Sequence, residues 1–384
     1  MIMKTMATVG MVAGLIACAV GSSSLSAGSS VDIANHTTYQ SSNRGVGKVA
    51  YDDYNIFLSQ LVLDVGMPDR IVGGRPSPGS GTKMIKGNKK KTRSEANRLF
   101  YHNIKDQGYV AITAMRKSLE AVTGTEEFDL LSPNERLAFW LNLRNLAVIE
   151  LVGENYPVKN AQKLVDRAME DKRLTVRGEP WSIQDIEVHV LTNWSNRLVI
   201  YGFHRGHIGS PNIRRRAYTG ASVWKELREN AEEFTYSLRG IQFKRDTAFV
   251  SQFYASVAYA FEDFEKDLRV HLRPLLSLNL RAKLDETKRI KARIRDSTVA
   301  DLYAGRTANV ERATGAGRAA LVSGMNVNGA LASAIWAKSA QGRSTTWPAH
   351  VQDLVRELSK RNFRRRLQGG TVTIERVESD RVER

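Results

Sequence analysis

Four side chains between positions 187 and 210 carry the functional groups of a hydrolase or transferase: Glu187, His189, His207 and Ser210. A serine hydroxyl becomes a nucleophile when a neighbouring histidine draws off its proton, so Ser210 with His207 or His189 is a candidate catalytic pair. Glu187 could then act as an acid or base, or it could anchor a loop by accepting backbone N–H groups. A Ser210-dependent hydrolase or transferase is therefore one hypothesis for this segment.

Two other hypotheses need no serine chemistry. His204 and His207, with His189 and Glu187, could bind a metal, because neutral imidazole is a common ligand. A His-x-x-His pair on a loop is weak evidence for such a site, and we predict no metal and no cofactor. The third hypothesis is that these residues are structural and lie in a pocket that does not react, and we adopt it as the working prediction.

The N-terminus predicts export. Lys4 precedes a nearly uncharged apolar stretch, and small polar residues follow as far as Ala27, which is the order of a secretory signal peptide over residues 1–27. The only cysteine, Cys18, lies within it, where it could be the lipidated residue of a lipoprotein or part of a discarded peptide. Both alternatives place the protein in the periplasm or at the outer membrane, and both leave the mature chain without a reactive thiol.

The charge of the chain predicts anionic partners. The formal net charge is +17 and the sequence pI is about 9.9, a balance that favours anionic lipid, lipopolysaccharide or acidic polysaccharide. We expect no nucleic acid as a partner, because export argues against it and no nucleic-acid-binding motif is present. The sequence does not indicate an oligomeric state.

Residues 133–153 are expected to form the central helix. Its start, Ser-Pro-Asn-Glu, is a capping box with proline at the first helical position. The helix is apolar nearly all round, which predicts a core position with Trp140 buried. Because buried amides need hydrogen-bond partners, Asn142 and Asn145 are expected to bond residues of the 182–211 region.

The remaining pattern predicts an α+β fold in which this helix packs on a small sheet. After a flexible tether over residues 28–50, a domain is expected over 51–280. Strands are expected at 197–203 and 243–253, with a hairpin at 173–182. Helices are expected at 51–65, 94–119, 182–191, 221–233 and 262–278.

Residues 281–384 are expected to form a basic C-terminal region, because they hold 21 Lys or Arg against 11 Asp or Glu. A helix is predicted over 348–367 and a last strand over 371–377. The helix has an apolar stripe that could dock on the protein or on a membrane: Val351, Leu354, Val355 and Leu358. Its end carries a basic cluster that could bind anionic lipid: Lys360, Arg361, Arg364, Arg365 and Arg366.

Several motifs, in order, resemble the domain-of-unknown-function family 547 (DUF547). Residues 138–145 read Ala-Phe-Trp-Leu-Asn-Leu-Arg-Asn, which resembles the family signature Ala-Phe-Trp-Ile-Asn-x-Tyr-Asn. Residues 155–157 read Asn-Tyr-Pro, as the family has after its signature helix. Residues 183–187 read Ile-Gln-Asp-Ile-Glu and resemble its Leu-x-Asp-Ile-Glu-His element. Ser-Pro at 210–211 and Ala-Tyr-Thr-Gly at 217–220 resemble its Ser-Cys-Pro and Ala-Tyr-x-Gly segments.

The departures from the family pattern remove the cysteine chemistry that the resemblance implies. Val188 stands where the family has histidine, Ser210 where it has cysteine before proline, Arg205 where a second cysteine falls, and Arg144 where the signature has tyrosine. Thiolate catalysis needs a Cys–His pair, and neither partner is present in register. The resemblance is compatible with a cysteine-peptidase-like architecture.

The resemblance and the charge together predict an exported envelope protein with a non-catalytic domain that binds an anionic ligand or surface. The candidate binding residues are Trp140, Asn142, Arg144, Asn145 and Arg205. The alternative function is a hydrolase or transferase that uses Ser210 with a nearby histidine.

Overall fold

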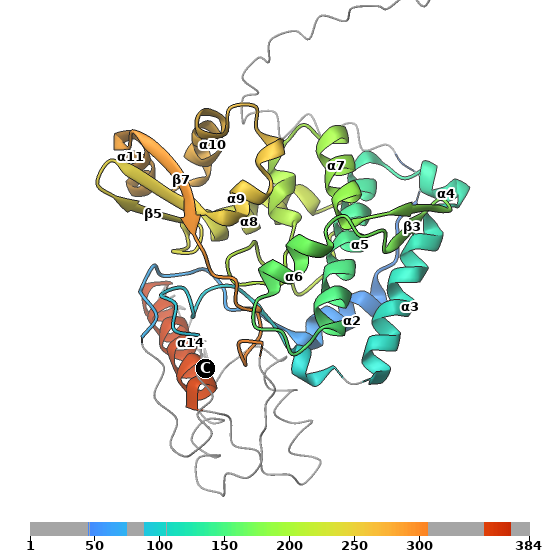
Figure 1. Cartoon of the computed structure of the whole chain (residues 1–384), viewed down its shortest axis with the longest axis horizontal. Helices are drawn as coiled ribbons and strands as arrows, with labels where there is room; N and C mark the ends of the chain where they lie inside the picture. The colour runs from blue at the N-terminus through green and yellow to red at the C-terminus, as the bar shows by residue number, and fades with distance from the viewer. Residues whose placement is uncertain (1–44, 46, 75–87, 105, 306–348, 370–384) are drawn as a thin grey trace, which may run out of the picture. The chain divides into compact units, whose positions relative to one another are not determined.

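The computed structural model describes residues 45, 47–74, 88–104, 106–305 and 349–369 (Figure 1). The expected signal peptide, most of the expected tether and the expected strand at 371–377 lie outside these residues. The described residues belong to one compact unit, Gly45–Arg384. Among them, no helix combines the length and the apolar character needed to cross a membrane.

The fold mixes helices with small sheets, which confirms the predicted α+β class. In the described part of the chain, the helices of eight residues or more are α2 (Asp52–Leu61), α3 (Asp106–Val122), α5 (Pro133–Glu154), α6 (Ala161–Ala168), α7 (Ile183–Asn193), α8 (Val223–Tyr236), α10 (Phe264–Leu272), α11 (Leu278–Glu286) and α14 (Ala349–Gly369). Shorter helices are α4 (Glu126–Asp129) and α9 (Gln252–Ser256), with 3₁₀ turns η2 (Tyr101–Asn103), η3 (Arg197–Gly202), η4 (Ala258–Ala260) and η5 (Arg273–Leu275).

The central helix α5 begins as predicted. The side chain of Ser132 accepts a hydrogen bond from the Glu135 backbone N–H, and Pro133 is the first helical residue. Nearly the whole helix is buried, so its polar side chains must find partners inside the protein. It packs mainly on the helices α3, α6, α7 and α8, whereas the sequence led us to expect a small sheet as its main partner (Figure 1).

The described strands form three separate sheets. Two are short antiparallel pairs: β1 (Val62–Leu63) with β2 (Arg98–Leu99), and the predicted hairpin of β3 (Leu174–Val176) and β4 (Glu179–Trp181). The third has the order β5 (Ile241–Lys244), β6 (Thr247–Ser251), β7 (Arg289–Ile294). Because β7 pairs in parallel with β6, the folded unit continues beyond residue 280.

The strand expected at 197–203 was wrong, because Arg197–Gly202 is the 3₁₀ helix η3. Its Val, Ile and Tyr side chains suit a strand, but they are buried by packing against α8 and α7, and tertiary packing overrides strand propensity. Gly202 allows a close approach to α5 and α8, since a Cβ atom there would lie 2.7 Å from the Leu141 side chain and 3.1 Å from that of Leu227. The segment expected as one strand at 243–253 holds the end of β5, a turn, β6 and the first two residues of α9.

Candidate functional site

A fully buried carboxylate, Glu187 on α7, is the centre of the polar site. Its Oε1 accepts hydrogen bonds from Arg144 on α5, at 3.1 Å from Nε and 2.6 Å from Nη2. Its Oε2 accepts from Arg205 Nη2 and from the Tyr259 hydroxyl, both at 2.6 Å. Arg144 and Glu187 are 0% exposed and Arg205 is 3% exposed. We call these four residues the Glu187 cluster.

The charges in the Glu187 cluster hold one another in the ionised form. Burial alone raises the pKa of Glu187, but the positive charges of Arg205 and Arg144 and the Tyr259 hydrogen bond outweigh it, so the pKa lies below its ordinary value. Burial lowers the pKa of Arg144, and Glu187 opposes that shift. Tyr259 is half exposed, but the desolvation of its hydroxyl and the nearby carboxylate raise its pKa, so the hydroxyl remains a donor. The cluster is therefore a salt bridge of one carboxylate and two guanidinium groups.

Asn145 and Arg144 fix the loop that follows η3. Asn145 Nδ2 donates to the Gly202 carbonyl at 2.9 Å, and its Oδ1 accepts from the His204 N–H at 3.2 Å. Arg144 Nη1 also donates to the His204 carbonyl. The prediction that Asn145 bonds the 182–211 region is confirmed. The equivalent prediction for Asn142 was wrong, because its amide bonds both the N–H and the carbonyl of Tyr218, in the later loop.

Ser210 is buried inside this loop with its hydroxyl occupied. The Oγ atom donates to the His207 carbonyl at 2.8 Å and accepts from the Arg205 N–H at 3.2 Å. Its hydrogen is thus held by a backbone oxygen rather than by an imidazole nitrogen. A nucleophilic serine needs a base at that position.

The two histidines of the loop are neutral and face the backbone. His204 Nδ1 lies 2.9 Å from the Pro211 carbonyl, and His207 Nδ1 lies 3.1 Å from the Asp296 carbonyl. A carbonyl can only accept, so each Nδ1 carries the hydrogen. Burial lowers the pKa of both imidazoles to about 3. Within the described residues, no group of three or more His, Cys, Asp or Glu side chains is arranged to hold a metal ion.

His189 lies in a different environment from Ser210. It packs among tryptophans, with its ring centroid 4.8 Å from Trp140, 5.5 Å from Trp181 and 6.2 Å from Trp194. Trp140 is 4% exposed, as expected, and stacks on Trp181 at 5.5 Å. Burial lowers the pKa of His189, with Arg136 adding to the shift. His189 therefore belongs to an aromatic cluster that it forms with Trp140, Trp181 and Trp194.

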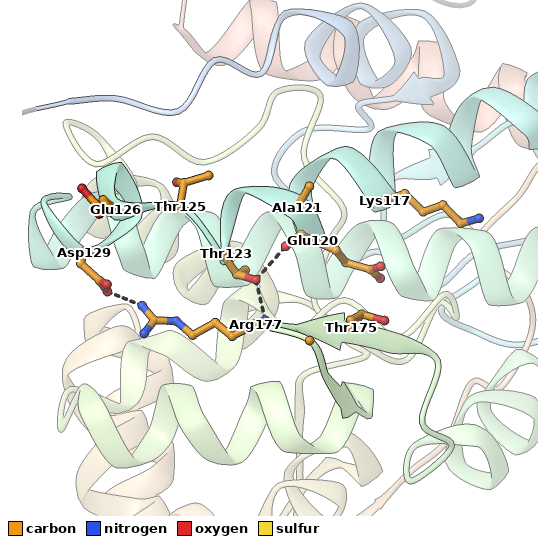
Figure 2. A pocket seen from close by; sticks show the side chains of 11 residues that line it. Lys117, Glu120, Ala121, Thr123, Thr125, Glu126, Asp129, Thr175 and Arg177 are labelled. Carbon is orange, nitrogen blue, oxygen red and sulfur yellow. Dashed lines mark hydrogen bonds and ion pairs between the residues drawn. The ribbon is translucent and has the colours of Figure 1, made fainter.

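A polar groove lies apart from the Glu187 cluster, between α3, α4 and the β3–β4 hairpin (Figure 2). Its volume is about 530 Å³, and Arg177 forms an ion pair with Asp129 across it. Thr123 links the two walls, since its hydroxyl donates to the Glu120 carbonyl at 2.7 Å and accepts from the Arg177 N–H at 2.9 Å. Three carboxylates and two basic side chains line the groove, so its charge does not favour an anion: Glu120, Glu126, Asp129, Lys117 and Arg177.

The apolar stripe of α14 docks on the protein. Its residues form a cluster with Leu63, Val65, Phe100, Leu302 and Tyr303. Of the basic cluster, Arg361 is 3% exposed and donates to the Ser94 carbonyl at 2.7 Å, and Arg364 pairs with Asp69 at 2.6 Å. Lys360 is exposed, and the side chains of Arg365 and Arg366 lie outside the described part of the chain. Binding of anionic lipid by this basic cluster stays a proposal. The contacts of Arg361 and Arg364 with the protein argue against it, because they leave fewer of the cluster's charges for lipid.

The sequence indicated Glu187, Arg144 and Arg205 as candidate residues, but it did not indicate that they bond one another. It gave no indication of Tyr259. Arg144 and Arg205 are 61 positions apart, so nothing in their spacing indicates a common partner. The only signal was chemical, because two arginines stand where the family pattern has uncharged residues, and a carboxylate is a favourable partner for a buried guanidinium. No such signal exists for Tyr259.

Comparison with known proteins finds one family. Residues 128–235 match the family described as "Protein of unknown function, DUF547". The match includes the signature helix α5 together with Glu187, Arg205 and Ser210, but it ends before Tyr259. No curated protein and no solved structure matches the chain. Together with the order of the motifs, this match shows that residues 128–235 contain a DUF547 domain.

Proposed function

We propose that the chain is an exported envelope protein whose DUF547 domain binds an anionic ligand or surface and does not catalyse a reaction. The main support for the proposal that the domain does not catalyse a reaction is the Glu187 cluster. Two positions at which this chain departs from the family pattern, Arg144 and Arg205, both bond the same carboxylate. The departures thus act together, and they form a buried salt bridge at positions where the family pattern has tyrosine and cysteine.

The hydrogen bonds of the neighbouring loop support the same conclusion. A catalytic serine must present its oxygen to substrate and its proton to a base. Ser210 Oγ instead joins the Arg205 N–H to the His207 carbonyl and has no exposed surface. The neutral imidazoles of His204 and His207 are directed through Nδ1 at backbone carbonyls.

A similar structural device occurs elsewhere in the protein. Arg239 is 0% exposed and bonds both oxygens of Glu233, at 2.8 and 2.6 Å. Neither residue belongs to a family motif named above. Since this chain uses a buried Arg–Glu pair to join its own elements there, a structural role for the Glu187 cluster needs no further assumption.

Net charge supports the anion-binding part. A protein with a net charge of +17 attracts polyanions through its overall field, and the attraction falls with ionic strength. The order of residues at the N-terminus supports export.

A fluorophosphonate probe tests the non-catalytic part, because such probes react with activated serines. We expect no adduct on the folded protein by intact-mass analysis, and the same outcome for Ser210→Ala. An adduct on wild type that Ser210→Ala abolishes would establish the hydrolase alternative and overturn the proposal.

A further inference from the structure

The three-stranded sheet has one face against the core and one face turned away from it. Paired residues in adjacent strands share a face, so Ala248 and Ile290 lie together, and Phe249 and Lys291 lie together. Ala248 and Ile290 belong to the core cluster, which also includes Leu268 and other side chains of α10 and α11. Figure 1 shows these two helices beside the sheet. The face with Phe249 is the outer one.

The outer face is strongly basic. Residues 288–295 read Lys-Arg-Ile-Lys-Ala-Arg-Ile-Arg, with five basic residues and no acidic one. Arg289 and Lys291 face outward, and Arg293 is exposed at a bulge where it has no partner opposite it in β6. Lys244, exposed at the end of β5, pairs in register with Thr247 on the same face. Along β7 the basic side chains recur about every 6.6 Å.

Carboxylates near this face leave most of the charge uncompensated. Asp246 pairs with Arg289 at 3.0 Å on the surface, where such pairs are worth little. Glu265 accepts a hydrogen bond from the Ile290 N–H at 3.2 Å. Arg295 donates to the neutral Gln252 side chain. Among the described residues, Lys244, Lys291 and Arg293 form no ion pair.

We propose that this outer face, formed by Lys244, Phe249, Lys291 and Arg293 with Arg289, binds a linear acidic polysaccharide. The proposal rests on the anion-binding function proposed above and locates it. Regularly spaced charges along one strand complement a polymer with regularly spaced carboxylates. Phe249 is half-buried and lies between Gln242 on β5 and Lys291 on β7, and it offers an apolar ring face to the C–H groups of a sugar.

Nucleic acid fits the face less well. Sheets that bind single-stranded nucleic acid stack two or three bases on outward aromatic side chains. Among the residues of β5, β6 and β7, Phe249 is the one aromatic that faces outward, since Phe243 packs against the core. The face has several basic side chains and a single outward aromatic, which favours a ligand recognised by its charge.

The test compares two variants of the full-length protein that lose the same charge. Lys244→Gln/Lys291→Gln/Arg293→Gln removes two lysines and one arginine from the outer face. The control, Lys159→Gln/Lys163→Gln/Arg167→Gln, removes the same residue types from exposed positions at α6. Binding to immobilised polygalacturonate is measured at ~0.15 M salt, with oligodeoxythymidylate and phosphatidylglycerol vesicles as further probes. Circular dichroism checks that both variants fold.

We expect the outer-face variant to lose roughly 100-fold in affinity, because each basic residue near an anionic surface contributes about fivefold, while the control loses far less. Phe249→Ala should weaken binding by an amount that does not change with salt. Equal loss in both variants would overturn the location but leave general anion binding in place. No binding of wild type to polygalacturonate, or tighter binding to the oligonucleotide or the vesicles, would overturn the choice of ligand, and neither result bears on the serine-labelling test.

Discussion

Glu187→Gln tests whether the Glu187 cluster stabilises the protein as a salt bridge. The substitution keeps the size of the side chain but removes the only carboxylate that bonds Arg144, Arg205 and Tyr259 together. It leaves Arg144 without its counter-ion and leaves Arg205 with only the half-exposed Asp166, 3.9 Å away. An amide N–H₂ group now also faces one of the donors. Breaking a buried ion pair in this way costs about 3–5 kcal/mol of unfolding free energy.

The assay is urea unfolding followed by tryptophan fluorescence, with a surface ion pair as control. Glu154 pairs with Arg173 at 2.5 Å, and the Glu154 side chain is 46% exposed. Glu154→Gln should therefore change the unfolding free energy by less than about 1 kcal/mol. A triple variant, Arg144→Met/Glu187→Leu/Arg205→Met, should recover part of the loss, since it leaves no charge buried without a partner.

The pH dependence supplies an independent check. Because the folded pKa of Glu187 is depressed, its contribution is present above the unfolded value of about 4.3 and is lost as pH falls through the folded value. The difference between wild type and Glu187→Gln should be largest near neutral pH and narrow in acid. A change under about 1 kcal/mol at neutral pH, or a difference that grows on acidification, would refute the account of the cluster.

Four further predictions concern other parts of the chain. Trp140→Ala should cost about 3–5 kcal/mol in urea unfolding, because a buried aromatic leaves a cavity; a loss near zero would show that the aromatic cluster is not part of the core. Val355→Asp should release α14 and make residues 349–369 sensitive to protease, since Val355 is 1% exposed in the cluster that docks the helix; unchanged protection would contradict that docking. Because His204 and His207 are held neutral with the pKa near 3, unfolding takes up protons below the ordinary histidine pKa of about 6.5. Stability should therefore fall by up to about 3 kcal/mol per pH unit below that value, and His204→Asn/His207→Asn should flatten the profile; an unchanged slope would count against their burial. A fusion of residues 1–40 to a periplasmic reporter should be exported and cleaved, and palmitate labelling that disappears in Cys18→Ser would identify a lipoprotein; retention at full length would contradict export.

The sequence predicted local structure well where one short segment determines it. The cap at Ser132, the hairpin at 173–182 and the burial of Trp140 follow from neighbouring residues, and the structure confirms them. It failed for η3, where the composition suits a strand and only packing against α7 and α8 decides the conformation.

The site could be predicted in its residues but not in its geometry. A lone arginine at position 144 or 205 looks like a surface residue, and only the fold brings both to Glu187. Conversely, Ser210 and His189 look like a reactive pair in the sequence. The structure places Ser210 in a backbone-bonded loop and His189 among tryptophans. Long-range pairing is set by tertiary packing, which a single sequence does not encode in its spacing.

Thiol accessibility at position 210 tests most directly whether this position, where the family pattern has cysteine, is closed in this protein. Cys18 is the only cysteine, so Cys18→Ser/Ser210→Cys places a single thiol at the site. Since Ser210 is 0% exposed, we expect iodoacetamide to alkylate the folded protein at least about a thousandfold more slowly than the urea-unfolded chain. Alkylation of the folded protein at a rate close to that of the unfolded chain would mean that position 210 lies in an open, reactive pocket, and it would contradict the account.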